Sequence, residues 1–335
     1  MGEQVEDFYE VLVIGGGAAG LSGALTLARA RRSVLVVDAG EPRNAPAAGV
    51  HGLLGVEGTP PGELLERGRA EVRAYGAHIT RGRVRSIEGG AGAFVALLED
   101  GRTMRAARLL VATGLVDELP DIPGLAERWG RDVLHCPYCH GWEVRDEPIG
   151  VLATGPMSVH QALMFGQWSA DVLFFANGTA VEAEQAERLA VRGIKVIEDR
   201  VMRVETVADA LTGVRLAGGE LVERRALAVA TRMVARADFL APLGLAPVAH
   251  PSGMGEHLPV DATGRSTVAG VWVAGNATDV SAQVGASGAA GTLAAAQINA
   301  DLINTEIDRA LTARRAFSAE VEREVAARAV PGHGL

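Results

Sequence analysis

The stretch Val11-Leu12-Val13-Ile14-Gly15-Gly16-Gly17-Ala18-Ala19-Gly20 decides the fold, because an apolar run stops at a glycine turn and leads directly into a helical pattern. The helical pattern is alanine-rich and covers residues 21–30, and a second apolar run follows at 34–37. This order predicts a strand, a tight turn, a helix and a second strand, which together form a βαβ unit.

The turn of this unit has the chemistry of a dinucleotide site. Gly15, Gly17 and Gly20 match the pattern GxGxxG, and Asp38 ends the second apolar run. Glycines allow a tight turn and a close approach to a pyrophosphate, the helix N-terminus attracts its charge, and an acidic side chain bonds ribose hydroxyls. A glycine-rich turn without a nucleotide is the alternative. The full context favours a dinucleotide, FAD or NAD.

A second α/β pattern lies in the middle of the chain. Strands are expected at residues 149–153, 172–175, 191–197 and 227–230, and a helix is expected at residues 158–168. A strand at 271–276 and a long helix at 289–307 follow, and residues 317, 321 and 325 are apolar at helical spacing, which favours a helix packed on the body or on another subunit. We predict an α/β fold of two nucleotide-binding-type, Rossmann-like, three-layer domains, with the second inserted in the first. The expected boundaries are 1–118 and 246–312 for the first domain, 119–245 for the second, and 313–335 for a C-terminal helical tail.

Composition narrows the choice of partners and location. The chain has 335 residues, a formal net charge of -9 and a single lysine, Lys195, which disfavours nucleic acid as a partner. The acidic start MGEQVEDFYE is unlike a signal peptide, and no segment approaches the roughly 20 apolar residues that a membrane span needs. We expect a cytoplasmic protein that is not embedded in a membrane.

Both cysteines of the chain lie in His135-Cys136-Pro137-Tyr138-Cys139-His140. Zinc would need four converging ligands, and the chain has no second CxxC or HxxxH, so no metal is expected. A structural bridge across so short a loop would constrain little of the unfolded chain. Redox cycling is favoured, because a CxxC at a helix start holds both sulfurs together while the helix N-terminus stabilises a thiolate. Pro137 suits the first helical position.

Two further motifs resemble those of a known family. Val111-Ala112-Thr113-Gly114 and Val273-Ala274-Gly275-Asn276 resemble the ATG and C-terminal GD motifs of two-domain flavoprotein disulfide reductases. Together with the late CxxC, their order resembles the low-molecular-weight thioredoxin reductase family over nearly the whole chain. The resemblance implies that the bound dinucleotide is FAD. Asn276 departs from the usual Asp; its amide can still bond a ribityl hydroxyl but adds no charge.

The resemblance also implies roles for individual residues. Cys139 would face the isoalloxazine, and Cys136 would exchange with the substrate sulfur. The reductases usually carry Asp after the second cysteine, whereas this chain has His140, which can accept or donate a proton near neutral pH. His135 is a second candidate for this acid/base role, and either histidine has the alternative of being a loop residue without a proton role. The residues expected to bind FAD are Gly15, Gly17, Ala18, Ala19, Gly20, Asp38, Arg43, Asn44, His51, Val84, Ala112, Thr113, Gly114, Gly275, Asn276, Gln283 and Val284.

The second domain lacks the expected NADPH chemistry. Its turn reads Ala153-Thr154-Gly155-Pro156-Met157-Ser158, in which Pro156 removes an N–H group and Met157 fills space that a pyrophosphate would need. No arginine lies between residues 171 and 187 to hold a 2′-phosphate. NADPH is therefore not expected to bind well.

An intact FAD site with a CxxC and a defective NADPH site resembles the branch of gliotoxin and holomycin dithiol oxidases. Residues 40–44 and the pair His51-Gly52 resemble that branch as well. The resemblance implies a homodimer that closes a disulfide in a small-molecule dithiol, with oxygen or another acceptor reoxidising the flavin. One alternative is a thioredoxin reductase that takes electrons from NADPH, ferredoxin or reduced flavin and acts on a thioredoxin-like protein. Another is a flavin-bound redox sensor without turnover.

Overall fold

The computed structural model describes residues 7–328, without the side chains of residues 316–320. The expected tail therefore lies partly outside the described residues, because its last segment, 329–335, is not among them. In the part that is described, no helix is both long enough and apolar enough to cross a membrane.

The glycine turn connects the central strand of the first sheet to its first helix, as expected. The strand order is β3-β2-β1-β6-β5-β4, with β19 beside β6. The β3, β2, β1, β6 and β19 strands pair in parallel, whereas β4, β5 and β6 pair antiparallel. The elements of this part are β1 (Tyr9–Ile14), α1 (Ala18–Arg29), β2 (Val34–Asp38), α2 (Pro61–Ala74), β3 (His78–Arg81), β4 (Val84–Glu88), β5 (Phe94–Leu98), β6 (Thr103–Val111), β19 (Val271–Val273) and α6 (Val284–Arg328).

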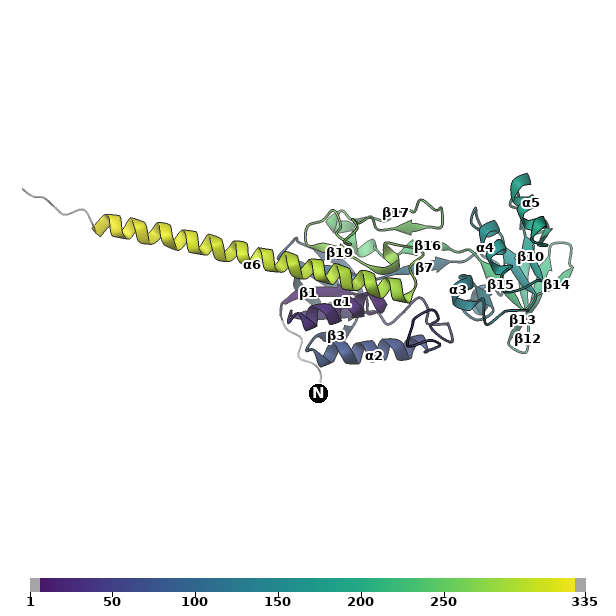
Figure 1. Cartoon of the computed structure of the whole chain (residues 1–335), viewed down its shortest axis with the longest axis horizontal. Coiled ribbons are helices and arrows are strands. Elements are labelled where there is room, and N and C mark those ends of the chain that lie inside the picture. The colour runs from purple at the N-terminus through teal and green to yellow at the C-terminus, as the bar shows by residue number, and fades with distance from the viewer. Residues whose placement is uncertain (1–6, 329–335) are drawn as a thin grey trace, which may run out of the picture.

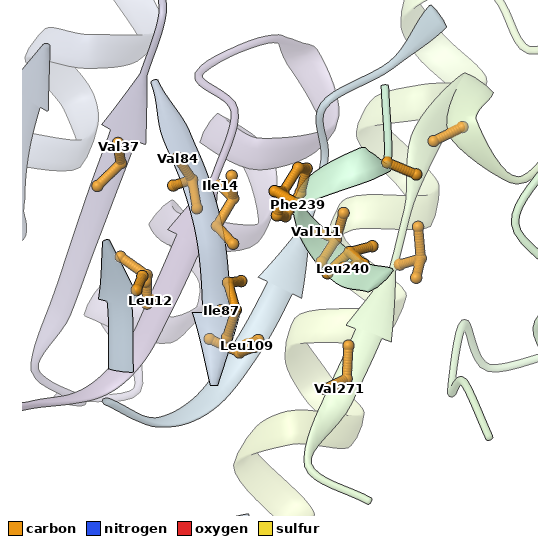
Figure 2. Packing of buried hydrophobic residues seen from close by; sticks show 14 of the residues in the cluster. Leu12, Ile14, Val37, Val84, Ile87, Leu109, Val111, Phe239, Leu240 and Val271 are labelled. Atoms are coloured by element: carbon orange, nitrogen blue, oxygen red, sulfur yellow. The ribbon is translucent and has the colours of Figure 1, made fainter. Parts of the chain in front are cut away.

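Strand β1 is covered on both faces, which explains its continuous apolar sequence. Successive side chains point to opposite faces of a sheet. Val11 and Val13 accordingly pack with buried residues of α1 and α6, whereas Leu12 and Ile14 pack on the other side. Figure 2 shows that second side, where strand residues of the sheet meet Phe239 and Leu240 from a short helical turn late in the chain.

The second sheet has the strand order β11-β10-β9-β15-β8 and is parallel throughout. A three-stranded antiparallel sheet, β12-β13-β14, packs beside it. The elements are β8 (Val133–Leu134), α3 (Pro137–His140), β9 (Ile149–Leu152), α4 (Ser158–Phe165), β10 (Val172–Phe175), α5 (Ala183–Val191), β11 (Lys195–Ile197), β12 (Val201–Val207), β13 (Ala210–Leu216), β14 (Leu221–Glu223) and β15 (Ala226–Val229).

The chain passes between the two sheets through a pair of antiparallel strands, β7 (Leu115–Glu118) and β16 (Arg232–Ala235). A small hairpin-like pair, β17 (Val248–Ala249) and β18 (Glu256–His257), follows. The chain then returns to the first sheet as β19, which pairs with β6. The predicted α/β class, with the second unit inserted in the first, is confirmed, while the residue boundaries of the domains stay a prediction.

Several expected bounds were wrong, and the helix expected at 158–168, for example, ends at Phe165. The strand expected at 191–197 begins only at Lys195, because Val191 still belongs to α5. The helix starts at a capping box, in which the backbone N–H of Glu182 donates to the side-chain oxygen of Gln185. A short apolar run cannot by itself distinguish the end of a helix from a strand.

Helix α6 is longer than the sequence predicts, since it begins at Val284 instead of 289 and runs without a break to Arg328. Figure 1 shows its second half extending away from the body of the molecule. Val321 and Val325 are 40% and 59% exposed, so their side chains do not pack on the body, and the side chain of residue 317 lies outside the described ones. The other expectation for the tail, contact with another subunit, stays a prediction.

Candidate functional site

A single cavity of about 950 Å³ joins the glycine turn of the first sheet to the cysteine pair that follows β8 of the second sheet. Most of the residues singled out from the sequence line it. They are Gly15, Gly17, Ala18, Ala19, Asp38, Arg43, Asn44, His51, Val84, Ala112, Thr113, Gly114, His135, Cys136, Cys139, His140, Asn276, Gln283 and Val284. Sequence positions that are more than a hundred residues apart therefore meet at one site.

Gly20 and Gly275 do not line the cavity but let its walls pack closely. A Cβ atom on Gly20 would lie 1.8 Å from the carbonyl oxygen of Gly15, so only glycine lets α1 approach the turn. Gly275 has a φ of +83°, and a Cβ there would lie 2.9 Å from the Cβ of Ala19. Both residues support the turn from behind.

The glycine turn itself is shaped for a close ligand. Gly15 has a φ of +107°, and a Cβ on it would lie 2.3 Å from the carbonyl oxygen of Ala112, which brings the two expected motifs together. Gly17 faces open space, since a Cβ there would meet no atom within 4 Å. The Asp38 carboxylate accepts the N–H of Gly16 at 3.1 Å and lies 3.3 Å from a guanidinium nitrogen of Arg69.

The two cysteines lie at the start of the one-turn helix α3, where Cys136 is the residue before the first helical position, Pro137. Both are free thiols. A hydrogen bond from Cys139, with the backbone N–H groups of Cys139 and Tyr138, lowers the pKa of Cys136 to about 6 although burial acts against it. The bond to Cys136 and burial raise the pKa of Cys139. Cys136 is therefore the thiolate of the pair at neutral pH.

Gln283, expected to bind FAD, lies at the sulfur atoms. Its side-chain nitrogen is 3.8 Å from Sγ of Cys136 and 4.0 Å from Sγ of Cys139. This contact joins the start of α6 to the cysteine pair and adds to the lowering of the Cys136 pKa.

The two candidate histidines differ in what their rings contact. Burial lowers the pKa of His140, and both of its ring nitrogens lie buried without a partner among the described residues. His135 is fixed, because its Nδ1 lies 3.1 Å from the carbonyl oxygen of Val229. Burial lowers its pKa as well. His140 is thus neutral and available for a proton, whereas one nitrogen of His135 is already committed.

Two residues expected to bind FAD are held by protein partners. The Nε and Nη2 atoms of Arg43 each lie 2.6 Å from an oxygen of Asp117, which also accepts the hydroxyl of Thr231. His51 lies between Glu57, 2.6 Å from its Nδ1, and Glu143, 3.6 Å from its Nε2. Both residues line the cavity, but their main contacts shape its wall.

The turn before α4 is closed in a way that the sequence indicates only in part. The hydroxyl oxygen of Ser158, which is fully buried, accepts the backbone N–H groups of Thr154 at 3.0 Å and Gly155 at 3.3 Å. These N–H groups are therefore already satisfied, and Met157 occupies the rim of the cavity beside them. Two of the N–H groups that a dinucleotide pyrophosphate would use in this turn are therefore taken, and Pro156 has none to donate.

Sequence reasoning missed several residues of the site. Asp117 and Glu143 become visible only when distant loops meet. Gln161 and Met164 could have been found, because they follow Met157 at helical spacing and line the same cavity. Gln161 also donates from Nε2 to the carbonyl oxygen of His135 at 2.6 Å. No group of three or more His, Cys, Asp or Glu side chains in residues 7–328 is arranged to hold a metal ion.

Comparison with known proteins identifies the class. The family model described as pyridine nucleotide-disulphide oxidoreductase matches residues 9–308. The chain belongs to this family, and within it resembles the thioredoxin reductases, which are flavoproteins that bind FAD.

Two curated relatives and two solved structures show which members of the family this chain is similar to. Thioredoxin reductase sirT of Leptosphaeria maculans is 30% identical over 71% of this chain and 78% of its own length. Thioredoxin reductase tcpT of Claviceps purpurea is 36% identical over 51% of this chain, and the match spans only 56% of that relative. Among solved structures, HlmI is 43% identical, covers 95% of this chain and 100% of its own, and superposes with a TM-score of 0.89. An oxidoreductase from Agrobacterium tumefaciens is 38% identical, covers 88% of this chain and 98% of its own, and has a TM-score of 0.83.

The residues of the cavity fit FAD. The open space at Gly17 and the start of α1 suit the pyrophosphate, and Asp38 lies where the second strand ends, within reach of a ribose. The side chain of Asn276 makes no hydrogen bond to another described residue and is free to bond the ligand. When bound, FAD supplies a two-electron acceptor beside the cysteine pair.

Proposed function

We propose that this protein is an FAD-dependent dithiol oxidase, which forms a disulfide in a small-molecule dithiol. One observation carries the proposal. The cysteine pair opens into the cavity of the first glycine turn, while two N–H groups of the corresponding turn of the second sheet are taken by Ser158. This contrast supports electron transfer to the flavin through the cysteines and disfavours NADPH as the electron donor.

The proposed reaction balances in three exchanges. A substrate thiolate attacks the Cys136 sulfur of the Cys136–Cys139 disulfide, and the second substrate thiol displaces Cys136, which leaves an oxidised substrate and a reduced pair. FAD held by the Gly17 turn, Asp38 and Asn276 would supply the two-electron acceptor that returns the reduced pair to the disulfide, and molecular oxygen, reduced to hydrogen peroxide with two protons, or another acceptor would take up these two electrons.

The low pKa of Cys136 fits the interchange role, because a thiol of low pKa is a good leaving group in disulfide exchange. His140 acts as the base that removes a proton from the incoming thiol. Its ring is neutral at pH 7 and has both nitrogens without a partner among the described residues, so it can accept that proton.

The proposal includes a cytoplasmic homodimer. The apolar side chains along the outer half of α6, such as Ile303 and Ile307, supply a surface for the second copy. A thioredoxin-like protein substrate and a sensor without turnover are the competing possibilities, and the experiment below separates all three.

The experiment compares electron donors in two assays, anaerobic stopped-flow for bleaching of the flavin and an oxygen electrode in air-saturated buffer for turnover. Dithiothreitol is expected to bleach the flavin of the wild-type protein and to support oxygen consumption, whereas stoichiometric NADPH does neither. Cys139→Ser should abolish the bleaching. Rapid reduction by NADPH followed by transfer to thioredoxin would instead identify a reductase. Unchanged bleaching in Cys139→Ser would favour a flavin that does not use the pair.

A further inference from the structure

Helix α4 presents two different faces. Val159, Ala162 and Phe165 point into the core of the second sheet, where all three are buried. Met157, at the N-terminal end, and Met164, two turns later, line the cavity of the cysteine pair. A spacing of seven residues places both methionines on one side of the helix.

The cavity-lining face of α4, called the wall below, is anchored to the segment that carries the cysteine pair. Gln161, between the two methionines on the same face, donates from Nε2 to the carbonyl oxygen of His135, directly before the cysteine pair. At the other end of the segment, the ring of Tyr138 packs edge-to-face on Trp168, with the centroids 5.9 Å apart. These two contacts hold the wall in a fixed position relative to Cys136.

The chemistry of this face suits an apolar ligand better than a charged one. Besides Met157, Gln161 and Met164 it carries His160, and it has no acidic side chain, lysine or arginine. The nearby Arg43 is already paired with Asp117. Methionine is flexible and polarisable, so it adapts its shape to an apolar or aromatic surface and makes favourable sulfur–aromatic contacts. The same Met157 that closes the turn to a pyrophosphate thus also supplies binding surface to the cavity.

We propose that Met157 and Met164 form the specificity wall of the substrate site and bind the uncharged, apolar body of a small aromatic or alkyl dithiol while its sulfur atoms reach Cys136. This inference rests on the proposed dithiol oxidase function. The wall would bind the part of the substrate that does not react. The molecule bound against α4 would be a small molecule and not a folded protein.

The test compares two dithiols that differ in their apolar body, o-xylene-α,α′-dithiol and dithiothreitol. We expect the wild-type holoenzyme to have the higher kcat/KM for the aromatic dithiol. Met157→Ala and Met164→Ala should each lower the ratio of the two kcat/KM values by about tenfold, mainly through KM of the aromatic dithiol, since each removes apolar surface from the wall. Met202→Ala is the matched control, because Met202 is exposed on β12 and does not line the cavity.

The outcomes separate this inference from the proposed function. Failure of both dithiols to reduce the flavin would overturn the function itself. Turnover of both with an unchanged ratio in the two wall variants would overturn the inference alone. Faster turnover of reduced thioredoxin than of either small dithiol, insensitive to Met157→Ala, would likewise exclude a specificity wall. Flavin content and the melting temperature of each variant show whether it is folded and loaded.

Discussion

Arg43 and Asp117 form a two-pronged ion pair that joins the loop after β2 to the strand that leads into the second sheet. Both distances are 2.6 Å, and the Asp117 side chain is only 5% exposed. Burial alone would raise the pKa of Asp117, but the hydrogen bond and charge of Arg43 hold it below its usual range. Arg43 lines the cavity, its expected contact with FAD stays a prediction, and its pairing with Asp117 holds the two halves of the cavity together.

Arg43→Met should destabilise the protein by about 3–5 kcal/mol at pH 7, since it leaves a buried carboxylate without its partner. Urea unfolding followed by circular dichroism measures this change. The stabilisation from the Asp117 carboxylate is present above the pKa of an unfolded aspartate and is lost as the pH falls through the lower pKa of the folded state. The variant should therefore lose less stability on acidification than the wild type. The double variant Arg43→Met/Asp117→Asn should regain part of the loss, and equal instability of both would contradict a charge effect.

Gly17→Val should lose FAD and keep its fold. The new side chain would project into open space at the start of α1, where the pyrophosphate is expected, so flavin absorbance per mole of protein should fall about tenfold or more. Gly20→Ala is the contrasting variant. Its methyl group would collide with the Gly15 backbone, and we expect it to lower the yield of folded protein. Full flavin content in Gly17→Val would place the ligand elsewhere.

The reduced protein should react with iodoacetamide at Cys136 first. Because the thiolate is the reactive form, the alkylation rate should rise with pH and reach half its plateau near pH 6, the value to which the hydrogen bonds lower the pKa of Cys136. Mass spectrometry of digested protein identifies the modified residue. Cys139→Ala removes the side-chain hydrogen bond to the Cys136 sulfur and should move the midpoint upward. Preferential labelling of Cys139 in the wild type would reverse the assigned roles.

His140→Gln should lower kcat/KM for dithiothreitol by about 100-fold, which is typical for the loss of a general base. In the wild type, kcat/KM should fall as the pH drops through the lowered pKa of His140, because protonation removes the base. The variant should lose this limb of the pH profile. His135→Gln is the comparison, and a smaller loss with an intact limb is expected there, since His135 is bonded to the backbone. The reverse pattern would assign the proton to His135.

Ile303→Asp and Ile307→Asp should shift the protein from dimer to monomer if α6 supplies the interface. A charge in an apolar interface is unfavourable unless it is paired, so the molar mass from light scattering should halve. Val207→Asp is a suitable control, because Val207 is 67% exposed on β12 in the second unit. An unchanged mass in both α6 variants would exclude this surface.

The fold could be predicted from the sequence because local and long-range signals agree in the first βαβ unit. The glycines, the apolar strands and the following helix admit few alternatives, and β19 was recognised as a strand that ends in a turn. Helices were predicted at 289–307 and in the tail, but not that they form one unbroken helix from Val284 to Arg328, since the outer half has little packing on the body to indicate its continuity. The start of α5 was missed because a capping box built on Glu182 and Gln185 is a weak signal.

Site residues could be predicted where the residue type and spacing alone indicate the chemistry. They could not be predicted where a residue's role depends on a partner that is distant in the sequence. Cys136, Cys139 and the glycine turn were found from spacing, and the structure brings them to one cavity. The pairing of Arg43 with Asp117 could not be predicted, because nothing in the local sequence indicates a partner 74 residues later. The hydrogen bonds of Ser158 to the N–H groups of Thr154 and Gly155 could not be predicted for the same reason, since only the folded turn brings these groups within reach.

The continuous helix α6 has a consequence for the shape of the molecule in solution. A helix of 45 residues is about 68 Å long, whereas a compact chain of 335 residues has a radius of gyration of about 20 Å. The rod raises the friction of the particle without adding much mass, so gel filtration should overstate the molecular weight. The sedimentation coefficient and the elution volume will therefore depend on this helix as well as on the number of subunits.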